Sequence, residues 1–213
     1  MTRRDERGYT LIEMMIATAL LSLVTAAAFG AVNVMTNQAA ATSDRFTAEG
    51  QGQTIADRIT KDLRTAVAPT STTDAFASAA SNDVVFYASL SDLSLPIGTG
   101  PIRLHAYTSL VPGTSVYIFH EDATPPDSYS PGNYTYTGTP VSRIDGEYID
   151  SSQPIFSYWD SAGNPINAPV PASQLGDIDA VGITLRIRVH PHSPVVVIST
   201  RIHIRNVDYN PDS

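Results

Sequence analysis

The amino-acid sequence predicts an α+β protein in which a long N-terminal helix packs on an antiparallel β-sheet head. Residues 14–32 contain no charged residue, which is typical of a long apolar helix. Residues 46–67 carry apolar side chains at helical spacing, and the β-forming runs after residue 81 are short and separated by Gly, Pro and Asp. A chain of 213 residues, 42% of them hydrophobic, can build one core with an extension.

The composition excludes several classes of protein. The chain has no cysteine, which excludes a disulfide scaffold, a thiolate zinc site and a cysteine nucleophile. Its formal charge of -8 argues against a nucleic-acid binder whose affinity comes from bulk positive charge. The motifs of serine hydrolases, zinc metalloproteases, P-loop proteins and dinucleotide-binding proteins do not occur in the sequence. We therefore expect no enzymatic activity, no catalytic residue and no cofactor.

The apolar N-terminal segment predicts a helix that crosses a membrane. Its nineteen uncharged residues approach the roughly 20 that a helix needs to span a ~30 Å hydrocarbon core. Arg3, Arg4 and Arg7 precede the segment, so the positive-inside rule places the N-terminus in the cytoplasm and residue 36 onward outside. A Sec signal peptide cleaved near residues 26–30 is the alternative, but the apolar run is longer than the usual stretch of about 7–15 residues.

Residues 7–17 read RGYTLIEMMIA. This segment resembles the leader of type IV prepilins, in which a glycine precedes the peptidase cut, an aromatic residue follows it, and a glutamate is fifth in the mature chain. Gly8, Tyr9 and Glu13 match these positions, with tyrosine where the family usually has phenylalanine. The resemblance implies cleavage between Gly8 and Tyr9, N-methylation of the new amine on Tyr9, and an assembly role for Glu13.

A physical argument supports the same role for Glu13. An acidic residue at the start of the apolar run costs on the order of 1–3 kcal/mol unless a partner offsets it. Cleavage would create an α-amino group on Tyr9, and the amine of a neighbouring subunit could pair with Glu13, because buried charge is tolerated when it is paired. We therefore predict a leader at residues 1–8 and a transmembrane and assembly helix at residues 9–35.

Residues 36–68 are predicted to continue the helix as an amphipathic half. Ile55, Ile59 and Leu63 repeat at helical spacing, and this stripe is expected to pack on the head while the first half of the helix projects as a stalk. Pro69 is expected to end the helix. Gly50 and Gly52 are expected as weak points that cost about 1 kcal/mol each relative to alanine. The charged residues are expected on the other sides of the helix: Asp57, Arg58, Lys61, Asp62 and Arg64.

Residues 69–213 are predicted to form a β-rich globular head. A linker of Ser, Thr and Ala is expected at residues 69–81, and a long polar loop at residues 121–140. The clearest hairpin is expected between Ala180–His190 and Val195–Val207. Further strands are expected at 84–87, 102–107, 116–120 and 155–159.

Residues 156–163 read FSYWDSAG and are followed by alternating Val, Ile and Arg up to Val189. This pattern is similar to the late strand, turn and strand of the J-type minor pseudopilins of type II secretion and of related minor pilins of type IV pili. The resemblance implies a pilin-like fold for the head. The C-terminal disulfide of that family has no counterpart here, because the chain has no cysteine.

The final hairpin is expected to have one buried and one basic face. Alternation places Ile187, Val189, Ile202 and Ile204 on the buried face. The basic face is expected to hold Arg186, Arg188, Arg201, Arg205, His190, His192 and His203. This face could dock acidic loops of a neighbouring subunit or bind an anionic polymer such as DNA; the alternative is a solvated face with acidic partners in the same chain.

No metal site is predicted. The basic face of the hairpin would repel a cation, although three of its histidines could meet. The acidic clusters at 121–122, 145–150 and 177–179 are similar to the loop calcium sites of some pseudopilins. None of them has the spaced Asp pattern and distant Glu of a calcium-binding loop.

These features together favour a minor pilin or pseudopilin, a structural and assembly-priming subunit of a type IV pilus or a type II secretion pseudopilus. Such a subunit spans the inner membrane once, with its head outside the cytoplasm, before it joins an extracytoplasmic filament. The implied partners are other minor and major pilins, the prepilin peptidase and the inner-membrane assembly platform. Two alternatives remain: the same architecture with a head that binds a surface, DNA or a secreted substrate, and a Sec-exported enzyme.

Overall fold

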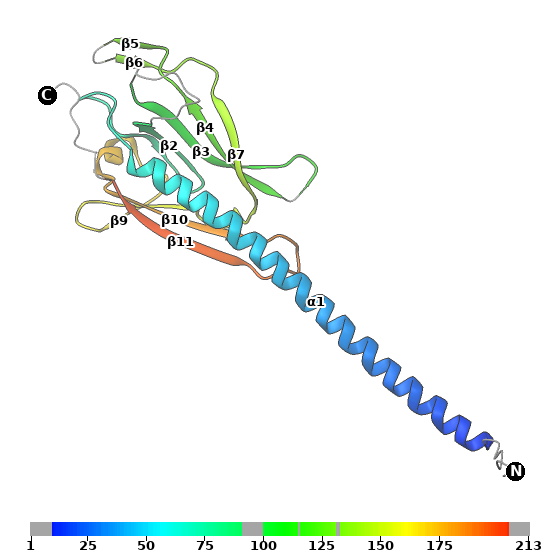
Figure 1. Ribbon diagram of the computed structural model, residues 1–213. Helices are drawn as coiled ribbons and strands as arrows, with labels where there is room; N and C mark the ends of the chain where they lie inside the picture. Colours follow the sequence, from blue (N-terminus) through cyan, green and yellow to red (C-terminus); the bar gives the residue numbers. More distant parts are fainter. Residues whose placement is uncertain (1–9, 91–99, 115, 131–132, 205–213) are drawn as a thin grey trace, which may run out of the picture. The chain divides into compact units, whose positions relative to one another are not determined.

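The computed structural model describes residues 10–90, 100–114, 116–130 and 133–204, and it contains a long helix and an antiparallel sheet (Figure 1). Helix α1 spans Leu11–Arg64 and has 54 residues. The chain divides into two compact units, residues 1–43 and residues 44–213, and the second unit holds the last part of α1 together with the sheet. The predicted α+β class is confirmed.

All strand pairs of the main sheet are antiparallel. In the described residues its order is β1-β2-β3-β4-β7-β10-β8-β9, and β11 pairs with β10. Strand β10 joins β7 through the single pair Ile187 and Ile149, whereas it runs beside β11 for eight consecutive pairs. The strands are β1 (Phe76–Ala79), β2 (Asp83–Ala88), β3 (Ile102–Leu110), β4 (Tyr117–Thr124), β5 (Ser128–Ser130), β6 (Asn133–Thr135), β7 (Val141–Ile149), β8 (Phe156–Trp159), β9 (Pro165–Ile166), β10 (Ala180–Ile187) and β11 (Val196–His203), with a 3-10 helix at Ala172–Asp177.

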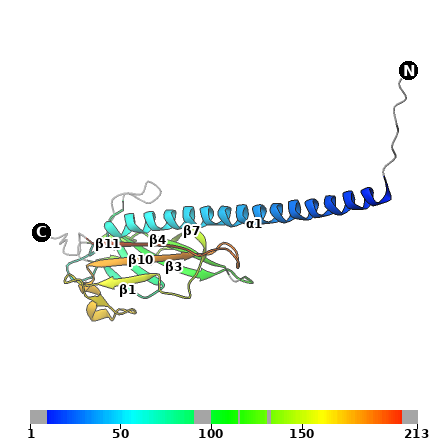
Figure 2. The same cartoon turned by 90° about the horizontal axis from the view of Figure 1, so that it is seen from below.

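The second half of α1 forms one wall of the hydrophobic core. Residues 44–64 lie along the strands of the sheet (Figure 2). Ile55, Ile59 and Leu63 are completely buried, which confirms the predicted apolar stripe. The sheet contributes the large buried side chains of the core: Phe76, Phe86, Phe119, Phe156 and Tyr158.

Helix α1 ends at Arg64, five positions before Pro69, where the sequence predicts its end. The chain leaves the helix here because its backbone pairs with the end of β2 instead. The N–H of Val67 donates to the carbonyl of Tyr87 at 2.9 Å, and the N–H of Ser89 donates to the carbonyl of Thr65 at 2.9 Å. Backbone pairing with the sheet therefore stops the helix before the proline is reached.

Three expectations for the head need correction. The predicted linker at 69–81 contains β1, whose Ala and Ser residues carry little strand signal. The predicted loop at 121–140 contains the end of β4 and the small β5–β6 hairpin. Strand β7 was not expected at all, because Arg143 and Asp145 occupy its positions beneath α1 where a strand pattern would have apolar residues. The hairpin of β10 and β11 is confirmed, with a turn at Pro191 and His192. Strand β10 ends at Ile187, before the predicted end at His190, and the predicted strand residues 205–207 lie outside the described residues.

The two glycines in the second half of α1 differ in their surroundings. A Cβ atom on Gly52 would overlap with Cδ1 of Ile198 and lie 2.8 Å from Cδ1 of Ile187, whereas nothing lies within 4 Å of the same atom on Gly50. Gly146 on β7 is equally close to α1, because a Cβ there would lie 2.6 Å from Cδ1 of Ile55. Gly52 is therefore a site of close approach between helix and sheet and not simply a weak point.

Valine at position 52 is expected to destabilise the head, while valine at position 50 has little effect. Both changes alter helix propensity equally, but only the first forces methyl groups into Ile187 and Ile198. Overpacking of this kind costs about 1–3 kcal/mol. Thermal melting of the full chain in detergent measures the difference between Gly52→Val and Gly50→Val. Equal melting temperatures for the two variants would contradict the close packing at Gly52.

Candidate functional site

The N-terminus of α1 is closed by a reciprocal set of hydrogen bonds between Thr10 and Glu13. The backbone N–H and the hydroxyl of Thr10 donate to Oε2 of Glu13 at 3.0 and 3.1 Å. In return, the N–H of Glu13 donates to Oγ1 of Thr10 at 3.3 Å. This is a capping box, in which two backbone donors that lack helical partners are both satisfied. The Thr-x-x-Glu pattern before an apolar run is typical of such a box, so Glu13 has a role within its own helix in addition to the predicted role between subunits.

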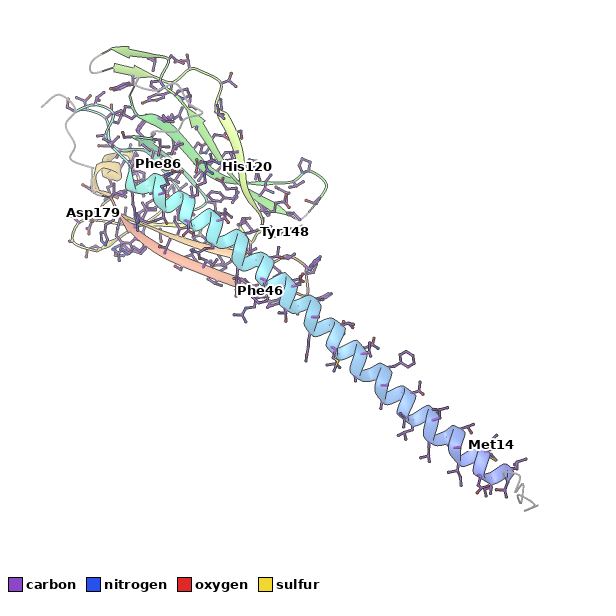
Figure 3. The ribbon with its side chains drawn as sticks, viewed as in Figure 1. Met14, Phe46, Phe86, His120, Tyr148 and Asp179 are labelled. Atoms are coloured by element: carbon purple, nitrogen blue, oxygen red, sulfur yellow. The ribbon has the colours of Figure 1, made fainter. Side chains whose placement is uncertain are left out.

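The first part of α1 has an exposed apolar surface that fits a lipid environment. Thirteen large apolar side chains between Leu11 and Met35 are each more than half exposed; Met14 is labelled in Figure 3. Hydroxyl groups within this stretch donate to backbone carbonyls of the helix itself. The hydroxyl of Thr18 donates to the carbonyl of Met14 at 3.0 Å, and the hydroxyl of Thr25 donates to the carbonyl of Leu21 at 2.7 Å. Polar groups that are satisfied internally carry a smaller cost in hydrocarbon. Of the described helices, α1 alone is long and apolar enough to cross a membrane.

The predicted processing residues Gly8 and Tyr9 lie outside the described residues. The predicted assembly residue Glu13 is described and lies in the first turn of α1.

A second polar feature is a cluster of charged side chains between α1 and the sheet. Arg143 on β7 forms ion pairs with Glu121 on β4 and with Asp145, where its Nε lies 2.8 Å from Oδ1. Arg58 on α1 approaches the same Asp145 oxygen at 3.7 Å. Asp62, expected on an outer side of the helix, is instead 5% exposed and faces the cluster.

Burial determines the charge of this cluster. It raises the pKa of Glu121 to about 9, and the nearby carboxylates of Asp62 and Asp145 act in the same direction. Burial also raises the pKa values of Asp62 and Asp145, which Arg58 opposes. Burial therefore favours the protonated form of Glu121, whereas the contact with the Arg143 guanidinium favours its carboxylate.

The histidines form separate pairs. His190 Nδ1 lies 3.0 Å from Asp44 on α1, and His203 Nδ1 lies 3.2 Å from Asp179. His105 Nε2 lies 2.7 Å from Asp83, and His120 Nε2 lies 2.7 Å from the hydroxyl of Ser109 (His120 is labelled in Figure 3). Within the described part of the chain, no group of three His, Cys, Asp or Glu side chains could hold a metal ion.

The outer face of the last hairpin carries an aromatic and cationic stack. The Cζ atom of Arg201 lies 4.1 Å from the ring centroid of Trp159, which is an attractive cation–π geometry. Gly182, on the strand between them, makes room for the indole, since a Cβ there would lie 2.6 Å from the ring. The predicted alternation is confirmed for Ile187, Ile202 and Ile204, which are buried, and for Arg201 and His203, which are exposed. Val189 is only partly buried, and Arg205 lies outside the described residues.

Comparison with known proteins identifies the N-terminal segment. Residues 3–29 match the family model described as the prokaryotic N-terminal methylation motif. No curated protein and no solved structure gives a significant match to the chain. The matched stretch includes Gly8, Tyr9 and Glu13 and continues into the apolar part of α1. The motif and the long apolar helix support a membrane-anchored, type IV pilin-like protein with a prepilin cleavage signal.

Proposed function

We propose that this protein is a minor pilin or pseudopilin that helps to start or extend a type IV pilus or a type II secretion pseudopilus. The observation that carries the proposal is the methylation motif at residues 3–29. It stands at the start of a 54-residue helix whose first part is apolar and exposed and whose last part packs into a β-sheet head. Proteins with this motif are structural subunits, so the residues of interest act in processing and assembly.

The proposed mechanism has three steps. The apolar part of α1 holds the precursor in the inner membrane, with the head outside the cytoplasm. The peptidase then cuts between Gly8 and Tyr9 and leaves a positively charged amine on Tyr9. This amine pairs with Glu13 of a neighbouring subunit, and the exposed apolar side chains of the two helices pack together as they leave the lipid.

A minor role is supported by the late part of the head. Strand β8, the turn after it and β10 follow the elements of the J-type resemblance in order. In that turn, the side chain of Asp160 accepts a hydrogen bond from the N–H of Asn164 at 2.7 Å, and Gly163 adopts a φ of 82°, which favours glycine. We infer a minor subunit from this pattern, and other pilins as its main partners.

Valine at position 8 is expected to block leader removal. The peptidase has to fit the residue before the cut, and a branched Cβ crowds that subsite. Gly8→Val should therefore accumulate as full-length precursor in the membrane, whereas Gly8→Ala, which lacks branching, should still be cleaved in part. Mass spectrometry of the chain extracted from membranes reads the N-terminus directly. A Gly8→Val protein that starts at Tyr9, or a wild-type protein that starts near Gly30, would overturn the proposed processing.

A further inference from the structure

Strand β11 is a long free edge of the sheet. It has eight residues, pairs in the described part of the chain only with β10, and keeps a continuous register without a bulge (Figure 1). The other two edges are blunted: β9 has two residues, and β1 has four with an irregular register. Natural edge strands are usually protected by charged side chains, proline, a bulge or shortness. Strand β11 has no proline and no bulge, and its charged side chains are confined to Arg201 and His203 at its end.

The hydrogen-bond pattern tells which backbone groups of β11 point away from the sheet. The N–H of Thr184 donates to the carbonyl of Ile155, which directly precedes β8. The backbone N–H and carbonyl groups of even-numbered residues of β10 therefore point toward β8, and those of odd-numbered residues point toward β11. The N–H of Ile204, directly after β11, donates to the carbonyl of Asp179, directly before β10, which agrees with the register of these two strands. The N–H and carbonyl groups of the odd-numbered residues of β11, centred on Ser199, therefore point to the open edge. Within the described residues they make no backbone hydrogen bond across it.

A groove runs beside this edge. It has a volume of about 570 Å³ and is lined by Arg45, Glu49 and Gln53 of α1 and by residues 194–198. The inward-facing side chains Val196 and Ile198 are only partly buried, so the core is incompletely covered at this margin. The side chains of an added strand would lie in this groove, against Val196 and Ile198 and beside the Arg45–Glu49 ion pair.

The charge of the edge indicates what kind of strand fits. Arg201 is exposed on the outer face of β11 and stacks on Trp159, and Arg186 lies on the same face of β10. His203 lies on this face beside Asp179. A second copy of β11 laid antiparallel with Arg201 opposite Arg201 would place like charges on one face, and such like charges destabilise a strand pair. An acidic side chain at that place would be attracted. We propose that the free edge of β11 binds an extended, acidic β-strand of a different protein chain.

This binding goes beyond the proposed assembly role of the N-terminus and is a property of the head. It is tested on the full chain in detergent micelles with a fluorescein-labelled peptide that alternates valine with threonine or glutamate. Fluorescence anisotropy is expected to show saturable binding. The same peptide methylated on alternate backbone nitrogens, which keeps every side chain but loses the edge hydrogen bonds, should bind at least about tenfold more weakly, as should a peptide with lysine in place of glutamate.

Variants of the chain give the matching test. Ser199→Pro removes an N–H that points to the open edge and leaves the hydrogen bonds to β10 in place. An edge strand tolerates proline at such a position. The variant should weaken binding at least about tenfold. Ser199→Ala keeps the N–H and should bind like wild type. Absence of saturable binding, or equal binding of the methylated peptide to the wild-type chain, would overturn the proposal even if Ser199→Pro failed to fold. Neither result depends on leader cleavage or filament assembly, so failure of the edge and failure of the pilin function are distinguishable.

Discussion

Replacement of Glu13 by alanine is expected to leave membrane insertion and leader cleavage intact and to abolish incorporation into filaments. Charged residues at mid-membrane cost about 2.5–3.5 kcal/mol on translocon scales, which is an upper limit for Glu13 at the start of the apolar run, so an anchor alone would be better served by alanine or leucine. The cap from Thr10 supplies hydrogen bonds to the carboxylate but no positive charge, and in the proposed mechanism that charge comes from the amine on Tyr9 of an adjacent subunit. Loss of one member of a buried pair costs about 3–5 kcal/mol. Affinity purification of the variant from membranes should therefore recover partner pilins at least about tenfold less well than wild type.

The capping box provides the control for this experiment. Thr10 and Glu13 bond to each other within one chain, so an alanine variant loses a helix cap as well as a charge. Glutamine is an accepted residue at this position of a capping box, and Glu13→Gln keeps the cap while it removes the charge. If intersubunit charge pairing governs assembly, Glu13→Gln fails like Glu13→Ala. If the variant assembles at wild-type levels, the role of Glu13 is to cap its own helix, and the pairing mechanism is wrong.

The stability of the head is expected to fall as the pH rises, and Glu121→Gln should weaken this dependence. In the unfolded chain Glu121 loses its proton near its ordinary pKa, whereas in the folded head its pKa is about 9. The folded state therefore binds more protons between these values, and its stability decreases as the pH rises from about 5 to 9. Glutamine imitates the protonated acid at every pH. At pH 8.5 the variant should melt at least about 3 °C above wild type, which corresponds to about 1 kcal/mol for a chain of this size.

A second glutamate on the sheet serves as the matched control. Glu147 on β7 is exposed, and Glu147→Gln should leave the pH profile of the melting temperature unchanged. Both variants are measured as full chains in detergent at pH 5.5, 7 and 8.5. A Glu121→Gln protein that is less stable than wild type at all three pH values, with the wild-type slope retained, would mean that Glu121 is ionised in the fold and that its negative charge holds Arg143.

The elements that could be predicted from the sequence are those whose signal is local. The stripe of Ile55, Ile59 and Leu63 follows from helical periodicity alone, and the alternation of β10 and β11 follows from the two-residue period of a strand. The α+β class needs only these two patterns. Strand β7 could not be predicted, because the side chains on its core-facing side are partly ionic and their ion-pair partners come from α1 and β4.

The candidate sites divide in the same way. The N-terminal motif is contiguous, so Gly8, Tyr9 and Glu13 could be selected from the sequence. Asp62 could not be placed correctly, because helical periodicity assigns it to a flank and its neighbour Glu121 is brought near it only by the order of the strands. The free edge of β11 is likewise a property of strand order, which no local pattern contains.

The stack of Arg201 on Trp159 has a practical consequence, because Trp159 is the only tryptophan in the chain. Indole emission from the whole protein therefore originates at one place, on the outer face of the sheet, beside a side chain of β11. Any event that moves Arg201, such as unfolding of the head or attachment of a strand at the β11 edge, changes the surroundings of that single fluorophore. The chain thus carries an intrinsic optical reporter, and the state of its head can be followed by emission wavelength without a label.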